Sequence, residues 1–190
     1  MQIKHCFLVA SLLATPFVSA ADAGLGIEFG TKFQTFTDSN FDGGSANYFR
    51  LVFAESKNSS FYFQNESGQI NASVGDATSV LSTSVTGIGA STMVAPSIYA
   101  DIMVGSSSIN GVAATGTGTN AITAIQSTSP IAEVGVNWVK NTGSLSLKAG
   151  ASYRILTSSN TINFTDSSGK LNRASDLSSV HLNLALNYSF

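Results

Sequence analysis

The feature that most constrains this chain is a two-residue alternation of apolar and polar side chains, clearest in residues 180–190 at the C-terminus. Residues 25–35 and 144–156 repeat the pattern. It recurs over shorter stretches at residues 49–53, 61–64, 98–104 and 132–138. Successive side chains of a β-strand point to opposite faces of a sheet, so each stretch predicts a strand with one apolar and one polar face. The expected fold class is therefore all-β.

Composition indicates which face meets water. Only 11% of the residues are charged, whereas a soluble domain carries roughly 25%, and the polar positions are rich in Gly, Ser and Asn. A soluble β-sandwich, with the aromatic residues in its core, would need a more strongly charged exterior. In a transmembrane β-barrel the apolar side chains face lipid and the polar ones line the lumen. We therefore predict an antiparallel, up-and-down transmembrane β-barrel.

The lengths of the connections support this topology. Short turns are predicted at residues 55–59 and 140–143, and long loops at residues 37–45 and 157–176. Outer-membrane barrels alternate short periplasmic turns with long outer loops in this way. Both termini then lie on the periplasmic side.

The number of strands depends on the middle of the chain, which must contribute an even number. One strand is predicted at residues 98–104, and another between about residues 78 and 94, where the alternation is poor. These two give eight strands in all. Residues 106–129, rich in Gly, Thr and Ser, are predicted to form a third outer loop, although two further strands in the middle would give ten.

The N-terminus has the pattern of an export signal. Lys4 precedes an apolar run over residues 6–17, and Val18-Ser19-Ala20 has the small-residue pattern of a cleavage site. We predict a signal peptide at residues 1–20, read by the Sec pathway, and an outer-membrane β-barrel domain at residues 21–190.

The final strand carries alternating leucines followed by two aromatic residues. These are Leu182, Leu184, Leu186, Tyr188 and Phe190. Together with the signal peptide and the even set of amphipathic strands, they resemble the small eight-stranded outer-membrane barrels of Gram-negative bacteria, of the OmpA, OmpX and OmpW type. In that family the terminal aromatic pattern is read by the barrel assembly machinery. The resemblance implies an outer-membrane location, with outer-membrane lipid and lipopolysaccharide as partners.

Projecting the polar faces inward fills the lumen with ionisable side chains. They are Glu28, Lys32, Arg50, Asp101, Glu133, Lys148, Arg154 and His181. Three acids then face four bases. An eight-stranded barrel is just wide enough for side chains to fill, and buried charges need partners. The sequence therefore predicts a nearly neutral polar plug rather than an open channel.

Aromatic residues on the opposite faces fall into two groups. Phe33, Phe49 and Tyr153 are expected near the outer rim. The inner rim is expected to hold Phe53, Phe61, Phe63 and Trp138, together with Tyr188 and Phe190. Such girdles mark the two membrane interfaces.

Several function classes are disfavoured. His181 is the one histidine after residue 20, and the carboxylates lack metal-ligand spacing, so we predict no enzyme, metal or cofactor. A net charge of −2 disfavours nucleic-acid binding. A structural or surface-interaction role remains, with an extracellular ligand at the loops around residues 41–44, 106–129 and 160–173. The alternative is a transport channel for small or apolar solutes. The balanced internal charge favours the structural or surface-interaction role.

Overall fold

The structure, a computed structural model, describes a barrel and a small sheet. The described residues are 24–37, 41–56, 58–74, 77–111, 114–115, 121–122, 127–156, 162–165, 171–174 and 178–190. The predicted signal peptide, residues 1–20, lies outside this part of the chain. Among the described residues, no helix has the length and apolarity to span a membrane.

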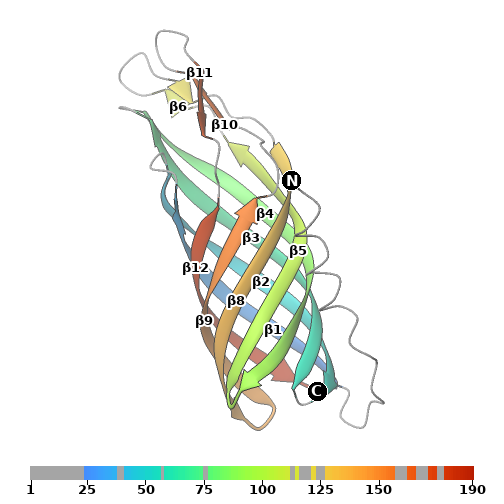
Figure 1. Ribbon diagram of the computed structural model, residues 1–190. Helices are drawn as coiled ribbons and strands as arrows, with labels where there is room; N and C mark the ends of the chain where they lie inside the picture. Colours follow the sequence, from blue (N-terminus) through green and yellow to red (C-terminus); the bar gives the residue numbers. More distant parts are fainter. Residues whose placement is uncertain are drawn as a thin grey trace.

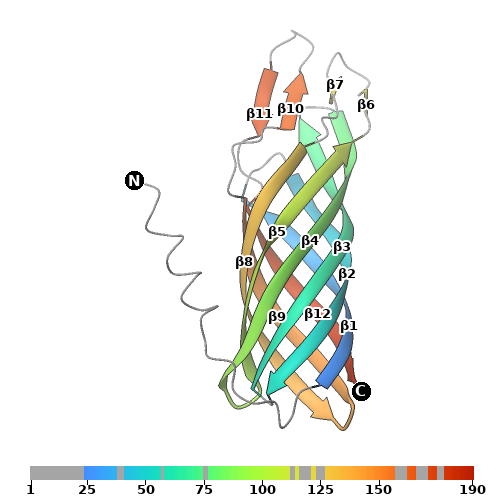
Figure 2. The ribbon, with the colours of Figure 1, turned by 90° about the vertical axis from the view of Figure 1, so that its right-hand side faces the viewer.

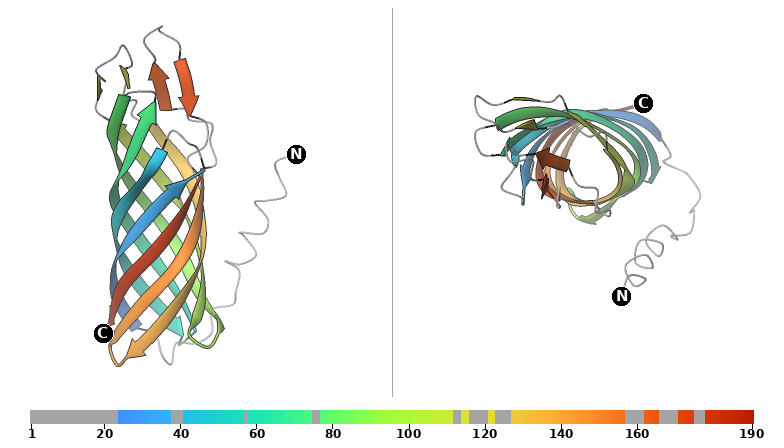
Figure 3. Two further views of the ribbon diagram at one scale, coloured as in Figure 1. Left: turned by 90° about the vertical axis from the view of Figure 1, so that its left-hand side faces the viewer. Right: turned by 90° about the horizontal axis from the view of Figure 1, so that it is seen from above.

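Eight long strands form the barrel (Figure 1). They are β1 (Gly24–Phe36), β2 (Phe41–Ser56), β3 (Ser59–Val74), β4 (Ala77–Ala95), β5 (Ile98–Gly111), β8 (Ser127–Thr142), β9 (Leu145–Leu156) and β12 (Ser179–Ser189). Their order is β1-β12-β9-β8-β5-β4-β3-β2, and the ring closes where β1 pairs with β2. Viewed from above, the sheet surrounds a central axis (Figure 3). The prediction of an all-β, eight-stranded antiparallel barrel is confirmed, and the ten-stranded alternative is wrong.

Neighbouring strands pair in long, regular antiparallel registers. Register shifts occur between Phe41 and Gly43, between Ala54 and Ser56, and between Met93 and Ala95, all close to strand ends. The β3–β4 and β5–β8 pairings run from end to end without a shift. The described barrel wall is therefore a continuous ladder of backbone hydrogen bonds.

The two ends of the barrel differ. The short turns and the C-terminus lie at one end, which we call the turn end (Figure 2). The other, the sheet end, carries a second sheet of four short strands, β6 (Ala114–Thr115), β7 (Ala121–Ile122), β10 (Ile162–Thr165) and β11 (Leu171–Ala174). Pairing of β7 with β10 joins the two long connections.

Two predicted loops are partly wrong because the strands run further than expected. The loop predicted at residues 37–45 ends earlier, since β2 begins at Phe41, which is buried. The loop predicted at residues 106–129 also loses both ends, since β5 continues to Gly111 and β8 begins at Ser127. The short turns are tighter than predicted: β2 ends at Ser56, and Gly143, with a φ of +73°, follows the end of β8.

The face that carries apolar side chains changes along the strands. Towards the turn end the outward face is apolar, and we call its residues the apolar belt; they include Phe29, Phe63, Ile88, Val134, Val136, Leu182 and Leu184. Towards the sheet end of β3 and β4 the outward face is polar, with exposed Asn65, Ser67, Ser82 and Ser84. There the apolar side chains point inward and form the sheet-end core, made of Phe41, Ala46, Ile70, Ala72, Leu81, Val85, Ile109 and Ile131.

This inversion explains why the alternation looked poor in the middle of the chain. A strand that leaves hydrocarbon and enters water must exchange its apolar and polar faces to keep apolar groups out of water. In β4 the exchange falls between Ser84, which is outward and polar, and Ile88, which is outward and apolar. The long strands therefore carry two opposite polarity patterns, as strands that run from hydrocarbon into water require.

Candidate functional site in the barrel lumen

The structure places all eight ionisable residues named from the sequence inside the barrel, each buried. It adds one carboxylate that the sequence reading left out, Glu66 on β3. The lumen therefore holds four acids and, besides His181, four bases, rather than three acids and four bases. Its formal charge is zero when His181 is neutral.

Four of these charges form a closed ring, which we call the sheet-side tetrad: Lys32, Glu66, Glu133 and Arg154. Lys32 Nζ lies 3.1 Å from Glu66 Oε2 and 2.6 Å from Glu133 Oε1. Arg154 Nη2 lies 2.8 Å from Glu66 Oε2 and 2.7 Å from Glu133 Oε2. Each acid thus contacts both bases. Arg154 also binds Glu66 in a bidentate fashion, a strong, directional arrangement.

The other four charges repeat this arrangement closer to the turn end, in the turn-side tetrad: Glu28, Arg50, Asp101 and Lys148. Arg50 Nη1 lies 3.1 Å from both Glu28 Oε1 and Asp101 Oδ2. Lys148 Nζ lies 2.9 Å from Asp101 Oδ2 and 3.6 Å from Glu28 Oε2. Here too each acid faces both bases, although the contacts are on the whole longer.

Strand geometry explains why two rings form. On β1, Glu28 and Lys32 are four residues apart and so share the inward face. On β9, Lys148 and Arg154 are six residues apart and also share it. Each of these strands therefore gives one charge to each tetrad, and the remaining four strands that contribute give one charge each.

Gln64 connects the tetrads. Arg50 Nε donates to Gln64 Oε1 at 2.6 Å, and Gln64 Nε2 donates to Glu66 Oε2 at 3.0 Å. A single amide thus satisfies one group from each ring. Because Gln64 is itself fully buried, replacing it by an apolar residue would leave the Arg50 donor without this partner.

Two buried tyrosines pack against the tetrad cations. The Arg50 guanidinium lies 4.0 Å from the ring centroid of Tyr62 and 5.0 Å from that of Tyr48, within cation–π range. Glycines make room for both rings: a Cβ on Gly30 would lie 2.4 Å from the Tyr48 ring, and one on Gly89 would lie 2.3 Å from the Tyr62 ring. Gly30 and Gly89 are therefore packing positions for lumen side chains.

Glu66 could have been found from the sequence. Tyr62, Gln64 and Glu66 are spaced two apart, so they continue one face of β3. The predicted strand at residues 61–64 ends at Gln64 because the outward residues change there from Phe63 to Asn65, which breaks the apolar half of the pattern. What still indicates Glu66 is the two-residue spacing of the inward residues, taken without the outward ones.

His181 lies beside the sheet-side tetrad. Its Nδ1 is 3.8 Å from Glu133 Oε2, and its Nε2 is hydrogen-bonded to Ser179 Oγ at 2.7 Å. The sequence reading did not anticipate a serine within reach of this imidazole. Both residues are almost completely buried, with Ser179 at 2% and His181 at 0% exposure. Within the part of the chain that is described, no cluster of His, Cys, Asp and Glu is arranged to hold a metal ion.

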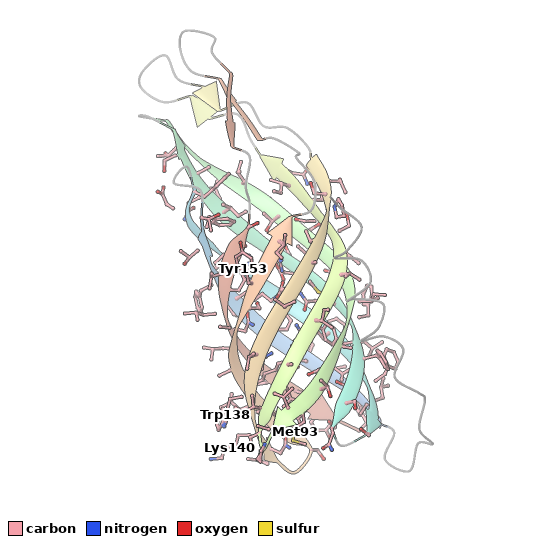
Figure 4. All side chains as sticks on the ribbon, viewed as in Figure 1. Met93, Trp138, Lys140 and Tyr153 are labelled. Carbon is pink, nitrogen blue, oxygen red and sulfur yellow. The ribbon has the colours of Figure 1, made fainter. Side chains whose placement is uncertain are left out.

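The remaining sequence-predicted residues lie on the outward face. Phe33, Phe53, Phe63, Trp138 and Tyr153 are exposed, and Phe49 and Phe61 are half-buried. Figure 4 shows Trp138 near the turn end and Tyr153 further towards the sheet end. On β12, Leu182, Leu184, Leu186, Tyr188 and Phe190 are all exposed. Tyr188 and Phe190 stack edge to face at 5.2 Å.

Comparison with known proteins gives the fold class. No protein-family model and no curated protein matches the chain. A major outer membrane protein from Thermus thermophilus superposes with a TM-score of 0.54 at 12% identity, covering 87% of this chain and 99% of the other. Ail, the attachment invasion locus protein of Yersinia pestis, gives a TM-score of 0.50 at 11% identity, covering 90% and 100% of the two chains.

A third solved structure agrees with these two. Neisserial surface protein A gives a TM-score of 0.50 at 13% identity, covering 91% of this chain and 100% of the other. Identities this low carry information on the fold alone. The chain therefore has the fold of the small eight-stranded outer-membrane barrels, which is the class that its sequence resembles.

Proposed function

We propose that the chain is an integral protein of the bacterial outer membrane whose lumen is closed by a polar plug and whose sheet end serves a structural or surface-interaction role. The observation that best supports a closed lumen is the pair of closed tetrads. Eight charges from six strands neutralise one another across the lumen, so their side chains fill the space that an aqueous pore would need.

The sheet-end core supports a closed lumen. On β4, the buried Val85 lies level with Glu66 of the sheet-side tetrad, and on β8 the buried Ile131 follows Glu133. Leu81 and Ile109, also buried, lie nearer the sheet end. An ion entering from the sheet end would have to pass these side chains, and the buried Thr83, Ser107 and Ser129 beside them, before it reached the tetrads. Side chains that fill the lumen leave no room for the ion's hydration water.

The alternative function, transport of small or apolar solutes, fits the wall less well. A lateral exit needs a break between neighbouring strands, and the described wall pairs continuously. The apolar side chains in the lumen are buried in a packed cluster that includes Val52, Tyr62 and Met103. Closed packing of this kind favours the plug over a pathway.

The surface role rests on the small sheet. Pairing of β7 with β10 ties two long connections into one unit beyond the barrel, which is where a rigid scaffold places recognition elements (Figure 2). We propose that this unit meets an extracellular ligand or a neighbouring surface. Limited proteolysis of intact cells is expected to cut residues 112–126 and 157–176, while the barrel strands resist; complete resistance would contradict exposure of the sheet end.

Biogenesis follows from the same proposal. We propose that residues 1–20 direct export through the Sec pathway, that the outward row ending in Phe190 is read by the barrel assembly machinery, and that the apolar belt contacts outer-membrane lipid and lipopolysaccharide. The aromatic residues Phe33, Trp138 and Tyr153 would then lie at the interfaces. Deleting Phe190 should lower the amount of folded, heat-modifiable protein in cells while refolding in detergent is retained.

No enzymatic activity is proposed for the Ser179–His181 pair. Its 2.7 Å contact is that of a nucleophile and its base, but a nucleophile must also meet a substrate. Ser179 is 2% exposed. A fluorophosphonate probe is therefore expected to leave Ser179 unlabelled in the folded barrel, and stoichiometric labelling would contradict this.

Planar-bilayer recording tests the plug. The purified barrel is expected to show no large, stable conductance, and such a conductance in the wild-type protein would overturn the proposal. A Glu66→Ala, Arg154→Ala double variant removes one acid and one base, so the net charge of the lumen is unchanged. Because the two truncations open space in the lumen, this variant should conduct more than the wild type. Deletion of residues 113–125 should leave the wild-type behaviour unchanged, because the barrier lies in the barrel and not in the loop.

A further inference from the structure

The outward surface of β3, β4 and β5 is hollowed. A cavity of about 290 Å³ opens there, walled by the aromatic and aliphatic side chains of Phe53, Phe61, Phe63, Ile88, Ile102 and Val104. These three strands cross the front of the barrel in Figure 2. The floor of this hollow, which we call the β4 groove, is the backbone of Gly89 and the small side chain of Ala90.

Strand register explains why the groove exists. Ala90 pairs with Phe61 on one side and with Ile102 on the other, so a methyl group lies between two large side chains. Next to it, Gly89 pairs with Tyr62 and Met103 and carries no side chain, because the Tyr62 ring occupies the space beneath it. The inward side at Gly89 is thus filled by the Tyr62 ring, while the outward depression comes from the small methyl group of Ala90 between two large side chains.

The groove lies within the apolar belt, close to the turn end. Its polar boundary is the next outward-facing pair, two residues further along: Ser59 on β3 pairs with Thr92 on β4, and both side chains lie on the same outward face. An occupant would thus meet an apolar trough with hydroxyl groups at its turn-end side. This is the polarity of a lipid that lies with its tail in the belt and its head at the interface.

We propose that the β4 groove seats one acyl chain of a phospholipid from the leaflet on the turn side. This inference rests on the proposed membrane location. In hydrocarbon there is no hydrophobic gain from association, so retention must come from close packing. A concave apolar trough supplies more such contacts to a thin, flexible chain than a convex wall does.

A second copy of this chain fits the groove less well. Stable protein interfaces bury about 800 Å² on each partner, and two convex barrel walls touch along a narrow line. A side chain from a partner could enter the trough, but its strand could not follow. The shape therefore favours a lipid tail.

Native mass spectrometry of the full barrel, released from palmitoyl-oleoyl phosphatidylethanolamine vesicles, tests the proposal. We expect one lipid that resists collisional removal from the wild-type protein. Ala90→Phe fills the trough and should abolish this retained lipid. The matched control is Ala151→Phe, an exposed outward alanine on β9, which should keep it.

Each remaining outcome has a defined meaning. Equal retention in wild type and Ala90→Phe, or no retention in either, overturns the lipid seat. A dimer that Ala90→Phe dissociates would show that the occupant is a second copy, and would also overturn it. Flotation of the protein with vesicles checks membrane insertion separately, so failure of the groove and failure of the proposed location are distinguishable.

Discussion

Strands β3 and β4 pass through two regions of opposite polarity. In the turn half, phenylalanine and isoleucine point outward, and the buried Tyr62 and Gln64 point inward. In the sheet half, serine and asparagine point outward and Ile70, Leu81 and Val85 point inward. The contrast shows that the backbone fold does not fix which side of the wall is apolar. For the proposed membrane location, the surrounding solvent fixes it, and each strand changes its pattern where the solvent changes.

The largest expected effect is in the charged part of the lumen. Glu133→Ala should lower the free energy of unfolding by about 3–5 kcal/mol, because Lys32 and Arg154 would remain buried with half their counter-charge removed. Urea titration in lipid vesicles, followed by tryptophan fluorescence, measures it. Glu133→Gln keeps the volume and separates charge from packing, and a loss below about 1 kcal/mol in both variants would contradict a buried tetrad.

The interior of the sheet half should respond by a different mechanism. Leu81→Ala should cost about 2–5 kcal/mol, since Leu81 is fully buried and its removal leaves a cavity. Leu81→Met, which conserves volume, serves as the control and should cost less than about 1.5 kcal/mol. The same urea titration applies. If Leu81→Ala is neutral, the sheet-end core is not a packed core.

On the outward face of the turn half a charge should be costly. Val134→Lys places an ammonium in the middle of the apolar belt, and we expect a loss of about 2–4 kcal/mol in a bilayer. Because this cost comes from hydrocarbon, it should shrink in a detergent micelle that lets the lysine reach water. Equal stability in bilayer and micelle would mean that Val134 does not face lipid.

The matched substitution in the sheet half should have the smallest effect. Ser84→Lys adds the same ammonium to an exposed outward position on β4, and we expect a change within about 0.5 kcal/mol. Comparison with Val134→Lys in the same vesicles isolates the solvent, because both positions are outward and exposed. A loss of stability as large as that of Val134→Lys would mean that residue 84 lies in hydrocarbon, which would contradict a water-exposed sheet half.

These two regions also explain what could be predicted from the sequence. Strands β1, β9 and β12 keep one pattern over most of their length, so Lys32, Lys148 and His181 could be assigned to the lumen by parity. Strands β3 to β5 change pattern on the way. The alternation with outward apolar residues therefore stops before Glu66 on β3. It also stops before the sheet end of β5, so that segment was predicted as a loop.

Other features of the site depend on distances that no periodicity contains. Two such features are the closing of four charges into a ring and the joining of two rings by Gln64. Both depend on which strands face each other across the lumen. Ser179 and His181 are two residues apart and so share one strand face, where their side chains are hydrogen-bonded. Many other serines lie two residues from a polar side chain, so this spacing alone does not predict a hydrogen bond. The contact depends on three-dimensional packing.

The most direct test of the account is a spin-label scan along β4 in lipid vesicles, one cysteine at a time from residue 81 to residue 92. We predict that labels at Ser82 and Ser84 collide with a water-soluble nickel complex, and that labels at Ile88 and Ala90 collide with oxygen dissolved in the membrane. Labels at Thr83 and Val85, which point into the lumen, should meet little of either. Oxygen access without a two-residue period, or nickel access at positions 88 and 90, would contradict a barrel whose apolar face meets hydrocarbon and whose charges are enclosed.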